Sequence, residues 1–274
     1  MNLSKFFSFA LIFGSISMTS CAQLGKTVSN FNLFPVTDDV KLGKQVSDEI
    51  DNNKTEYPVL PRQGNEAAYA YLNKMRDKIL QNGNLKYRNV FSWEIKIIKK
   101  DDVLNAFCTP GGHIYVYTGL IKYLDSEDQL AGVLGHEMAH ADLRHSTRQM
   151  TKMYGLDVVS QIILGDKKNI AQITNGLIGL KFSRNHETEA DEYSVRYLCG
   201  TDYNAAGAAG FFMKMQNAQQ PPAFLSTHPN PKNRVQEITK NKNKLNCAGT
   251  KTYDSEYAKF KTLLGGSSST GKGK

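Results

Sequence analysis

The chain has 274 residues, of which 40% are hydrophobic and 22% charged, a composition typical of a globular protein that buries a real core. Its formal net charge is +8, but the basic residues are spread along the chain and form no stripe with interleaved aromatic residues, which argues against nucleic acid as a partner. We interpret the excess charge as a solvated basic face, with attraction to an anionic membrane surface as the alternative.

The N-terminus has the pattern of an export signal. Lys5 precedes a largely apolar run over 6–18, which is too short to span a membrane and typical of a signal-peptide core. The run ends at Ser20 and Cys21, a pair that resembles the lipobox of bacterial lipoproteins, with Met18 in place of the usual leucine. We expect a signal peptide at 1–20, a lipid on Cys21, a tether over 21–36, and a location on the periplasmic side of the outer membrane. The alternative is an ordinary secretory signal and a soluble periplasmic protein.

The rest of the chain predicts one helix-rich α+β domain with a single small sheet over 37–263. One helix is expected to begin at Thr37 and a second at Asn65. Alternation over 91–98 predicts a strand, and two short strands within 103–121 are joined by Pro110, Gly111 and Gly112. The later helices are expected at 127–145, 155–164, 170–183, 186–199, 204–218 and 231–243. The tail at 264–274 has little to bury and should be disordered.

The sequence His136-Glu137-Met138-Ala139-His140 is an H-E-x-x-H motif within an apolar helical pattern. Residues four apart share a helix face, so His136 and His140 can reach one cation. Glu137 lies beside that pair, where it can act as a general base on a water. We therefore predict one Zn²⁺ per chain, bound by these two histidines.

A catalytic zinc usually takes three protein ligands, and the third must come from elsewhere. His145 is expected to face away from the pair and to be a helix-end or packing residue. Glu187 and Asp191 share a face if 186–199 is helical, so Glu187 can supply an oxygen ligand and Asp191 can accept the spare N–H of a zinc histidine. Glu189 should point elsewhere.

Three cysteines remain after Cys21. In an oxidising compartment Cys199 and Cys247 could pair, while the alternative is that these two and Cys108 are all buried thiols.

These segments together resemble a known family. H-E-x-x-H followed by E-x-x-x-D, here HEMAHADLRH at 136–145 and FSRNHETEAD at 182–191, is similar to the HtpX/CAAX-prenyl-protease type of gluzincin zinc metallopeptidase. The segment at 105–121 is similar to the family's strand pair before the active-site helix, and STHPNPKNRV at 226–235 to its loop with a His-Pro pair and a following Arg. Within the family the chain looks like the soluble periplasmic branch, the beta-barrel assembly-enhancing protease and its lipoprotein relatives, without a TPR domain.

The resemblance implies a zincin-like metalloprotease fold, with His136, His140 and Glu187 as metal ligands. It also implies that Glu137 is the base and that Asp191 supports the ligands. A histidine in the matching loop of that branch can reach the metal and block it, and here that residue is His228. A loop histidine of this kind could also stabilise the oxyanion or be a plain loop residue. Arg234 could pair with an active-site carboxylate, stabilise the oxyanion, or lie on the surface of a helix.

The expected reaction is hydrolysis of peptide bonds in misfolded or unassembled envelope proteins, with Glu137 activating a zinc-bound water. The strand around Gly112, His113, Ile114, Tyr115 and Val116 is expected to hold an extended substrate if it forms a free sheet edge. The alternatives are a latent metal-bearing chaperone or assembly factor of the outer membrane with little proteolysis, a domain with a purely structural metal, and a zinc hydrolase of non-peptide amides.

Overall fold

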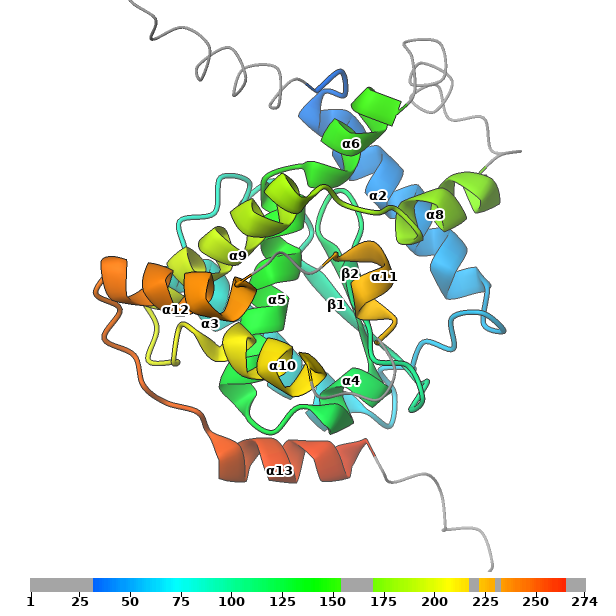
Figure 1. Cartoon of the computed structure of the whole chain (residues 1–274). Helices are drawn as coiled ribbons and strands as arrows, with labels where there is room; N and C mark the ends of the chain where they lie inside the picture. Colours follow the sequence, from blue (N-terminus) through cyan, green and yellow to red (C-terminus); the bar gives the residue numbers. More distant parts are fainter. Residues whose placement is uncertain (1–31, 154–169, 217–221, 230–232, 265–274) are drawn as a thin grey trace, which may run out of the picture. The chain divides into compact units, whose positions relative to one another are not determined.

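The computed structural model describes residues 32–153, 170–216, 222–229 and 233–264. In this part of the chain the fold is helix-rich with one three-stranded sheet, which confirms the predicted α+β class (Figure 1). The expected signal peptide at 1–20, the lipidation site Cys21, the helix at 155–164 and all of the tail after 264 lie outside the described residues. None of the helices in the described part is long and apolar enough to cross a membrane.

Two helices open the described chain, as the apolar spacing predicts. Helix α2 (Val36–Asn52) buries one face through Leu42, Val46 and Ile50. Helix α3 (Glu66–Asn82) packs against α5, α9 and the sheet. Residues of α2 belong to a small apolar cluster with β3 and α8, while α3 belongs to the main core.

The sheet has the strand order β1-β3-β2, with β1 (Glu94–Ile98) parallel to β3 (His113–Tyr117) and β2 (Ala106–Cys108) antiparallel to it. The turn between β2 and β3 contains Gly111 and Gly112, both at positive φ, as a tight turn requires. Strand β1 begins later than the predicted residue 91, after Trp93 in the left-handed region. The chain turns into helix α4 (Thr118–Tyr123) immediately after β3, where the sequence predicted a strand as far as 121.

The expected free edge at Gly112–Val116 is wrong, because β3 is the central strand and is paired on both sides. Every residue of β3 is buried. The edge of the hairpin is β2 instead, and β2 packs against α5.

Helix α5 (Glu127–Asp142) carries the H-E-x-x-H motif at the centre of the main core. It stops three residues before the predicted end at His145, because Arg144 has a φ of 59° and interrupts the helix. A separate helix, α6 (His145–Met153), begins there. This break changes the surroundings of His145, as described below.

Six further helices follow in the described part of the chain. They are α8 (Ile170–Ile178), α9 (Arg184–Cys199), α10 (Gly207–Gln216), α11 (Phe224–Thr227), α12 (Arg234–Lys244) and α13 (Asp254–Leu263). Helices α9 and α10 pack along α5, and α12 packs on both (Figure 1). The sequence predicted α8, α9, α10 and α12 but not the short α11 or the C-terminal α13. Cys199, at the end of α9, forms a disulfide with Cys247 beyond α12.

Candidate metal centre

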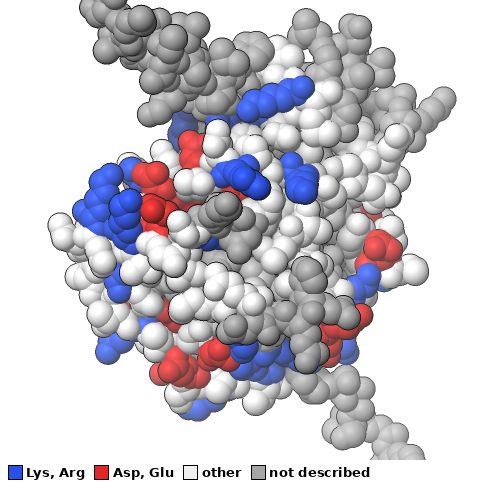
Figure 2. Space-filling view, in the orientation of Figure 1, with Lys and Arg blue, Asp and Glu red and all other residues white. Residues whose placement is uncertain are grey.

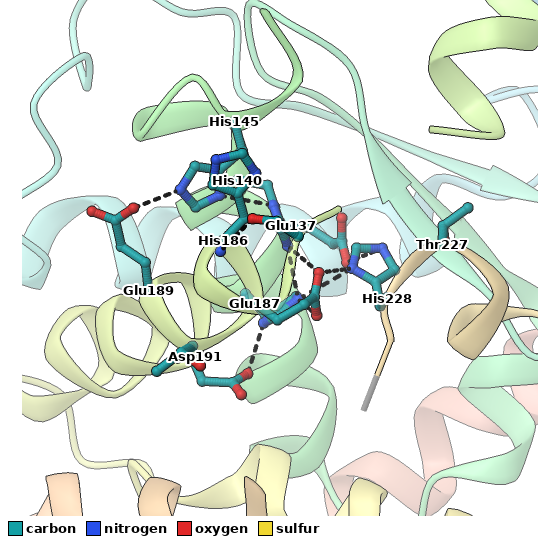
Figure 3. Close-up of polar contacts among 12 residues, drawn as sticks. Glu137, His140, His145, His186, Glu187, Glu189, Asp191, Thr227 and His228 are labelled. Carbon is teal, nitrogen blue, oxygen red and sulfur yellow. Dashed lines mark hydrogen bonds and ion pairs between the residues drawn. The ribbon is translucent and has the colours of Figure 1, made fainter. Parts of the chain in front are cut away.

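Four side chains from three places in the sequence meet in one buried cluster. His136 and His140 come from α5, Glu187 from the first turn of the neighbouring α9, and His228 from the residue after α11 (Figure 3). Ser183 begins α9 by accepting a hydrogen bond from the backbone N–H of His186, and this start places Glu187 opposite the histidine pair. One ligand atom of each residue lies within 4.8 Å of all the others. The structure thus brings together the three predicted ligands and His228.

The spacing of these atoms fits a tetrahedral metal ion. The Nε2 atoms of His136 and His140 are 3.0 Å apart, and His228 Nδ1 lies 3.4 Å from His136 Nε2. Glu187 Oε1 lies 3.1 Å from His228 Nδ1 and 3.4 Å from His140 Nε2. A tetrahedron with bonds of about 2.0–2.1 Å has edges of roughly 3.3–3.4 Å, so the observed separations match a small N,O-ligated cation.

The chemistry of the cluster also fits a cation. Oε2 of Glu187 is buried and makes no hydrogen bond among the described residues, and the Arg234 guanidinium supplies a positive charge 3.2 Å away. Burial alone would raise the pKa of Glu187, but the neighbouring imidazoles of His228, His136 and His140 outweigh it and hold that pKa well below its usual value. Glu187 is therefore a carboxylate, and two imidazoles with a carboxylate suit zinc best.

Glu137 lies beside the cluster on the same helix. Its Oε1 is 3.6 Å from His228 Nε2 and is buried without a hydrogen bond in the described structure. Burial raises the pKa of the Glu137 carboxyl, although the nearby His228 and His136 work in the opposite direction. A buried carboxylate with a raised pKa and a free oxygen can accept a proton from a water in the site.

Asp191 and Arg234 form the layer behind His136. The Nδ1–H of His136 donates to Asp191 at 2.9 Å, and this bond leaves Nε2 directed at the cluster. Arg234 donates to both oxygens of Asp191, at 2.6 and 2.7 Å, and its Nη2 lies 3.2 Å from Glu187 Oε2. The guanidinium rests over the ring of Phe212 and is only 2% exposed, so the surface-helix interpretation of Arg234 is wrong.

Aromatic rings close the remaining sides of the cluster. The ring of Phe182 stacks on that of His140 with centroids 4.0 Å apart, and Phe224 stacks on His228 at 4.2 Å. His136, Glu137, His140 and His228 are each 1% exposed. Neither phenylalanine was predicted as a site residue, although each lies within five residues of one.

The prediction for His145 is half right. It is a buried helix-end and packing residue, as expected, since it begins α6 and stacks on His186. It does not face away from His140, because the helix breaks at Arg144 and the Nδ1 atoms of the two histidines lie 2.9 Å apart. Glu189 does point away from the cluster, as predicted, and its target is His145. No sequence signal gives this contact, because a continuous helix would place the two histidines on different faces.

On the face drawn in Figure 2, the described basic and acidic side chains are intermixed. Lys and Arg side chains stand beside Asp and Glu in several places, and uncharged residues separate these groups. The described residues on that face form no continuous basic stripe of the kind that follows a nucleic-acid backbone.

Comparison with known proteins agrees with this geometry. The sequence profile of Peptidase family M48 matches residues 66–242, which include all four members of the cluster. The chain is 26% identical over 212 residues to the beta-barrel assembly-enhancing protease of Yersinia pestis, covering 70% of this chain and 43% of that protein.

Two mitochondrial relatives match a shorter stretch. The chain is 31% identical over 154 residues to the mitochondrial metalloendopeptidase OMA1 of Schizosaccharomyces pombe, covering 53% of this chain and 45% of that one. It is 32% identical over 149 residues to the protein of the same name from Arabidopsis thaliana, covering 52% and 30%. The chain thus spans less than half the length of these curated relatives.

Proposed function

This chain belongs to peptidase family M48, and on that premise we propose that it is a zinc-dependent metalloendopeptidase. The observation that carries the proposal is the buried cluster of His136, His140 and Glu187 with Glu137 beside it. Such a set combines three metal ligands with a general base, which are the groups that a zinc hydrolase requires.

We assign a separate task to each residue of the site. His136, His140 and Glu187 hold the metal, which when bound polarises the scissile carbonyl and lowers the pKa of a water. Glu137 takes a proton from the attacking water at its free carboxylate oxygen and passes it to the leaving amine. Arg234 keeps Asp191 in place and adds positive charge behind Glu187, and so favours the carboxylate form of that ligand.

The substrate is proposed to be a polypeptide bound along the outer edge of β2. The backbone N–H of Tyr117 donates to the carbonyl of Asn105, and the N–H of Thr109 donates to the carbonyl of His113. Asn105 and Thr109 therefore direct their backbone groups toward β3. By alternation, the backbone groups of Ala106 and Cys108 face away from β3. An extended chain that pairs there would run beside α5, and pairing through the backbone accepts many sequences.

We further propose misfolded or unassembled envelope proteins as substrates, within a protein quality-control role. One supporting observation is that several relatives are beta-barrel assembly-enhancing proteases. Another is the Cys199–Cys247 disulfide, which suits an oxidising compartment. In this proposal a signal peptide at 1–20 directs export, Cys21 carries lipid, and the catalytic domain at 37–263 lies on the periplasmic side of the outer membrane.

The closed state of the site favours a second function, that of a latent metal-bearing chaperone or assembly factor. His228 completes a set of four ligands, and all four are buried. A zinc site with four protein ligands leaves no open position for a water, and such sites are usually structural. Under this alternative the protein binds polypeptides and cuts few of them.

Removal and return of the metal distinguishes the two functions. The chain from residue 22 onward is freed of metal with a chelator, and its cleavage of unfolded casein is followed as zinc is added back. The protease predicts that cleavage is lost with the metal and returns as zinc reaches one equivalent. Stoichiometric zinc without cleavage, both in the wild type and after His228→Ala, would support the chaperone instead.

A further inference from the structure

We propose that His145 and Glu189 are positioning residues that set the orientation and tautomer of His140 for metal binding. The inference rests on the proposed function, since it requires that His140 is a metal ligand. It adds to the site a second support of the kind that Asp191 gives to His136.

A continuous chain of contacts leads outward from His140. Its Nε2 is turned toward His136 and Glu187, while its Nδ1 lies 2.9 Å from Nδ1 of His145. On the far side, Nε2 of His145 lies 3.0 Å from Oε2 of Glu189 (Figure 3).

The proton positions along this series of contacts follow from the Glu189 carboxylate at its outer end. The Glu189 carboxylate only accepts hydrogen bonds, so the proton of a neutral His145 must be on Nε2. Nδ1 of His145 is then an acceptor, and its contact with His140 is a hydrogen bond only if His140 carries its proton on Nδ1. That tautomer leaves the lone pair on Nε2 of His140 free for a metal.

Neighbouring side chains hold His145 and Glu189 in place. The ring of His145 is completely buried and stacks on the ring of His186, with centroids 4.5 Å apart and an angle of 12° between the planes. Arg148 lies 3.4 Å from Oε2 of Glu189 and restrains the carboxylate. The two metal histidines therefore have parallel support, His136 from Asp191 and His140 from the His145–Glu189 pair.

Zinc affinity tests the proposal without using proteolysis. The dissociation constant for Zn²⁺ is measured by competition with a chromophoric chelator, on the chain from residue 22 onward. The variants are Glu189→Leu, Glu189→Gln and His145→Phe. Glu192→Leu is the matched control, because Glu192 lies on the same helix, is similarly exposed and pairs with Arg196 outside the site.

We expect zinc binding to weaken by about 10-fold to 100-fold in Glu189→Leu and in His145→Phe, the range typical of a lost partner behind a metal ligand. Glu189→Gln, whose amide oxygen still accepts a hydrogen bond, should fall between Glu189→Leu and the wild type. Visible spectra of the Co²⁺-loaded proteins should change in Glu189→Leu but not in Glu192→Leu. If Glu189 served only packing, the Co²⁺ spectrum would not change in Glu189→Leu, and Glu189→Gln would not restore zinc affinity.

His145 is buried, so His145→Phe also changes packing, and the variants of the half-exposed Glu189 keep the test decisive. Wild-type affinity and spectrum in Glu189→Leu would overturn this inference alone. A wild-type protein that binds no stoichiometric zinc would overturn the proposed function, and this inference with it.

Discussion

The polar side chains of the metal centre are buried, and the two helical histidines each have a partner behind them. His136 donates to Asp191, which in turn accepts hydrogen bonds from Nε and Nη2 of Arg234. Among the described residues, His228 has no such partner, and its ring contacts members of the site and the rings of Phe182 and Phe224. It is thus the member of the cluster that is easiest to displace.

Substitution of His228 by alanine should increase proteolysis. Three ligands remain, so zinc should stay bound, and the opened position becomes available to water and substrate. We expect the initial rate of casein cleavage to rise several-fold, with zinc content unchanged. Ser226→Ala, on an exposed position of the same segment, is the control. Loss of both zinc and activity would instead make His228 an indispensable ligand.

Asp191→Ala should weaken the site in two ways. His136 loses the acceptor that fixes its ring, which should reduce zinc affinity by about 10-fold to 100-fold. Arg234 is left buried with its main partner removed, which should lower the free energy of unfolding by about 3–5 kcal/mol. Chelator competition and urea unfolding measure the two effects, with the exposed neighbour Glu192→Ala as control. Unchanged zinc affinity would exclude the assigned role of Asp191.

At the scale of secondary-structure elements, small residues on α5 allow its neighbours to approach closely. A Cβ on Gly132 would lie 2.3 Å from the backbone nitrogen of Ala208 in α10. The carbonyl of Gly132 also accepts a hydrogen bond from the Ser194 hydroxyl of α9, at 2.8 Å. This close packing of α5 and α9 sets the distance between the histidine pair and Glu187.

Gly132→Ala should therefore destabilise the protein even though alanine favours helix. The backbone of α10 must move to accommodate the methyl group, and we expect unfolding in urea to become easier by at least about 2 kcal/mol. Gly176→Ala in α8 is the matched control, because a Cβ there meets no atom of a described residue within 4 Å. That variant should be more stable than the wild type by roughly 0.5–1 kcal/mol. Equal effects at the two positions would refute the packing argument.

The secondary-structure elements differ in how well the sequence predicts them. The helices α5 and α9 were predicted from spacing that is local in the chain, and with them His136, Glu137, His140, Glu187 and Asp191 as members of one site. The order of strands in the sheet is a tertiary property, and β3 therefore turned out to be central rather than an edge. The break at Arg144 could not be predicted either, since left-handed backbone is unusual for arginine and no glycine or proline marks the position.

For the molecule as a whole, the Cys199–Cys247 disulfide connects the end of α9 to the segment that leads to α13. The cysteines are 48 residues apart, and the loop that they close contains α10, which packs against α5, and α12, which begins at Arg234 and packs against α9 and α10. The disulfide thus restrains the part of the chain that carries His228 and Arg234.

Reduction of this disulfide should destabilise the whole domain. A closed loop of this length removes roughly 4 kcal/mol of chain entropy from the unfolded state, and measured losses range from about 2 to 5 kcal/mol. The midpoint of urea unfolding for the double variant Cys199→Ser/Cys247→Ser, compared with the oxidised wild type, measures the loss. Thiol titration of the unfolded chain from residue 22 onward should detect Cys108 alone. If all three cysteines react in protein prepared without reductant, the disulfide is absent.

The central claim is that Glu137 acts as the base of a metal-dependent peptidase, and its most direct test is Glu137→Gln. Glutamine keeps the size of the side chain but cannot take a proton, while the proposed ligands His136, His140 and Glu187 are untouched. Zinc content and casein cleavage are measured on the same sample of the wild type and the variant. We predict equal zinc in both and a loss of cleavage in the variant of at least about 100-fold. Wild-type cleavage by zinc-loaded Glu137→Gln would contradict the account.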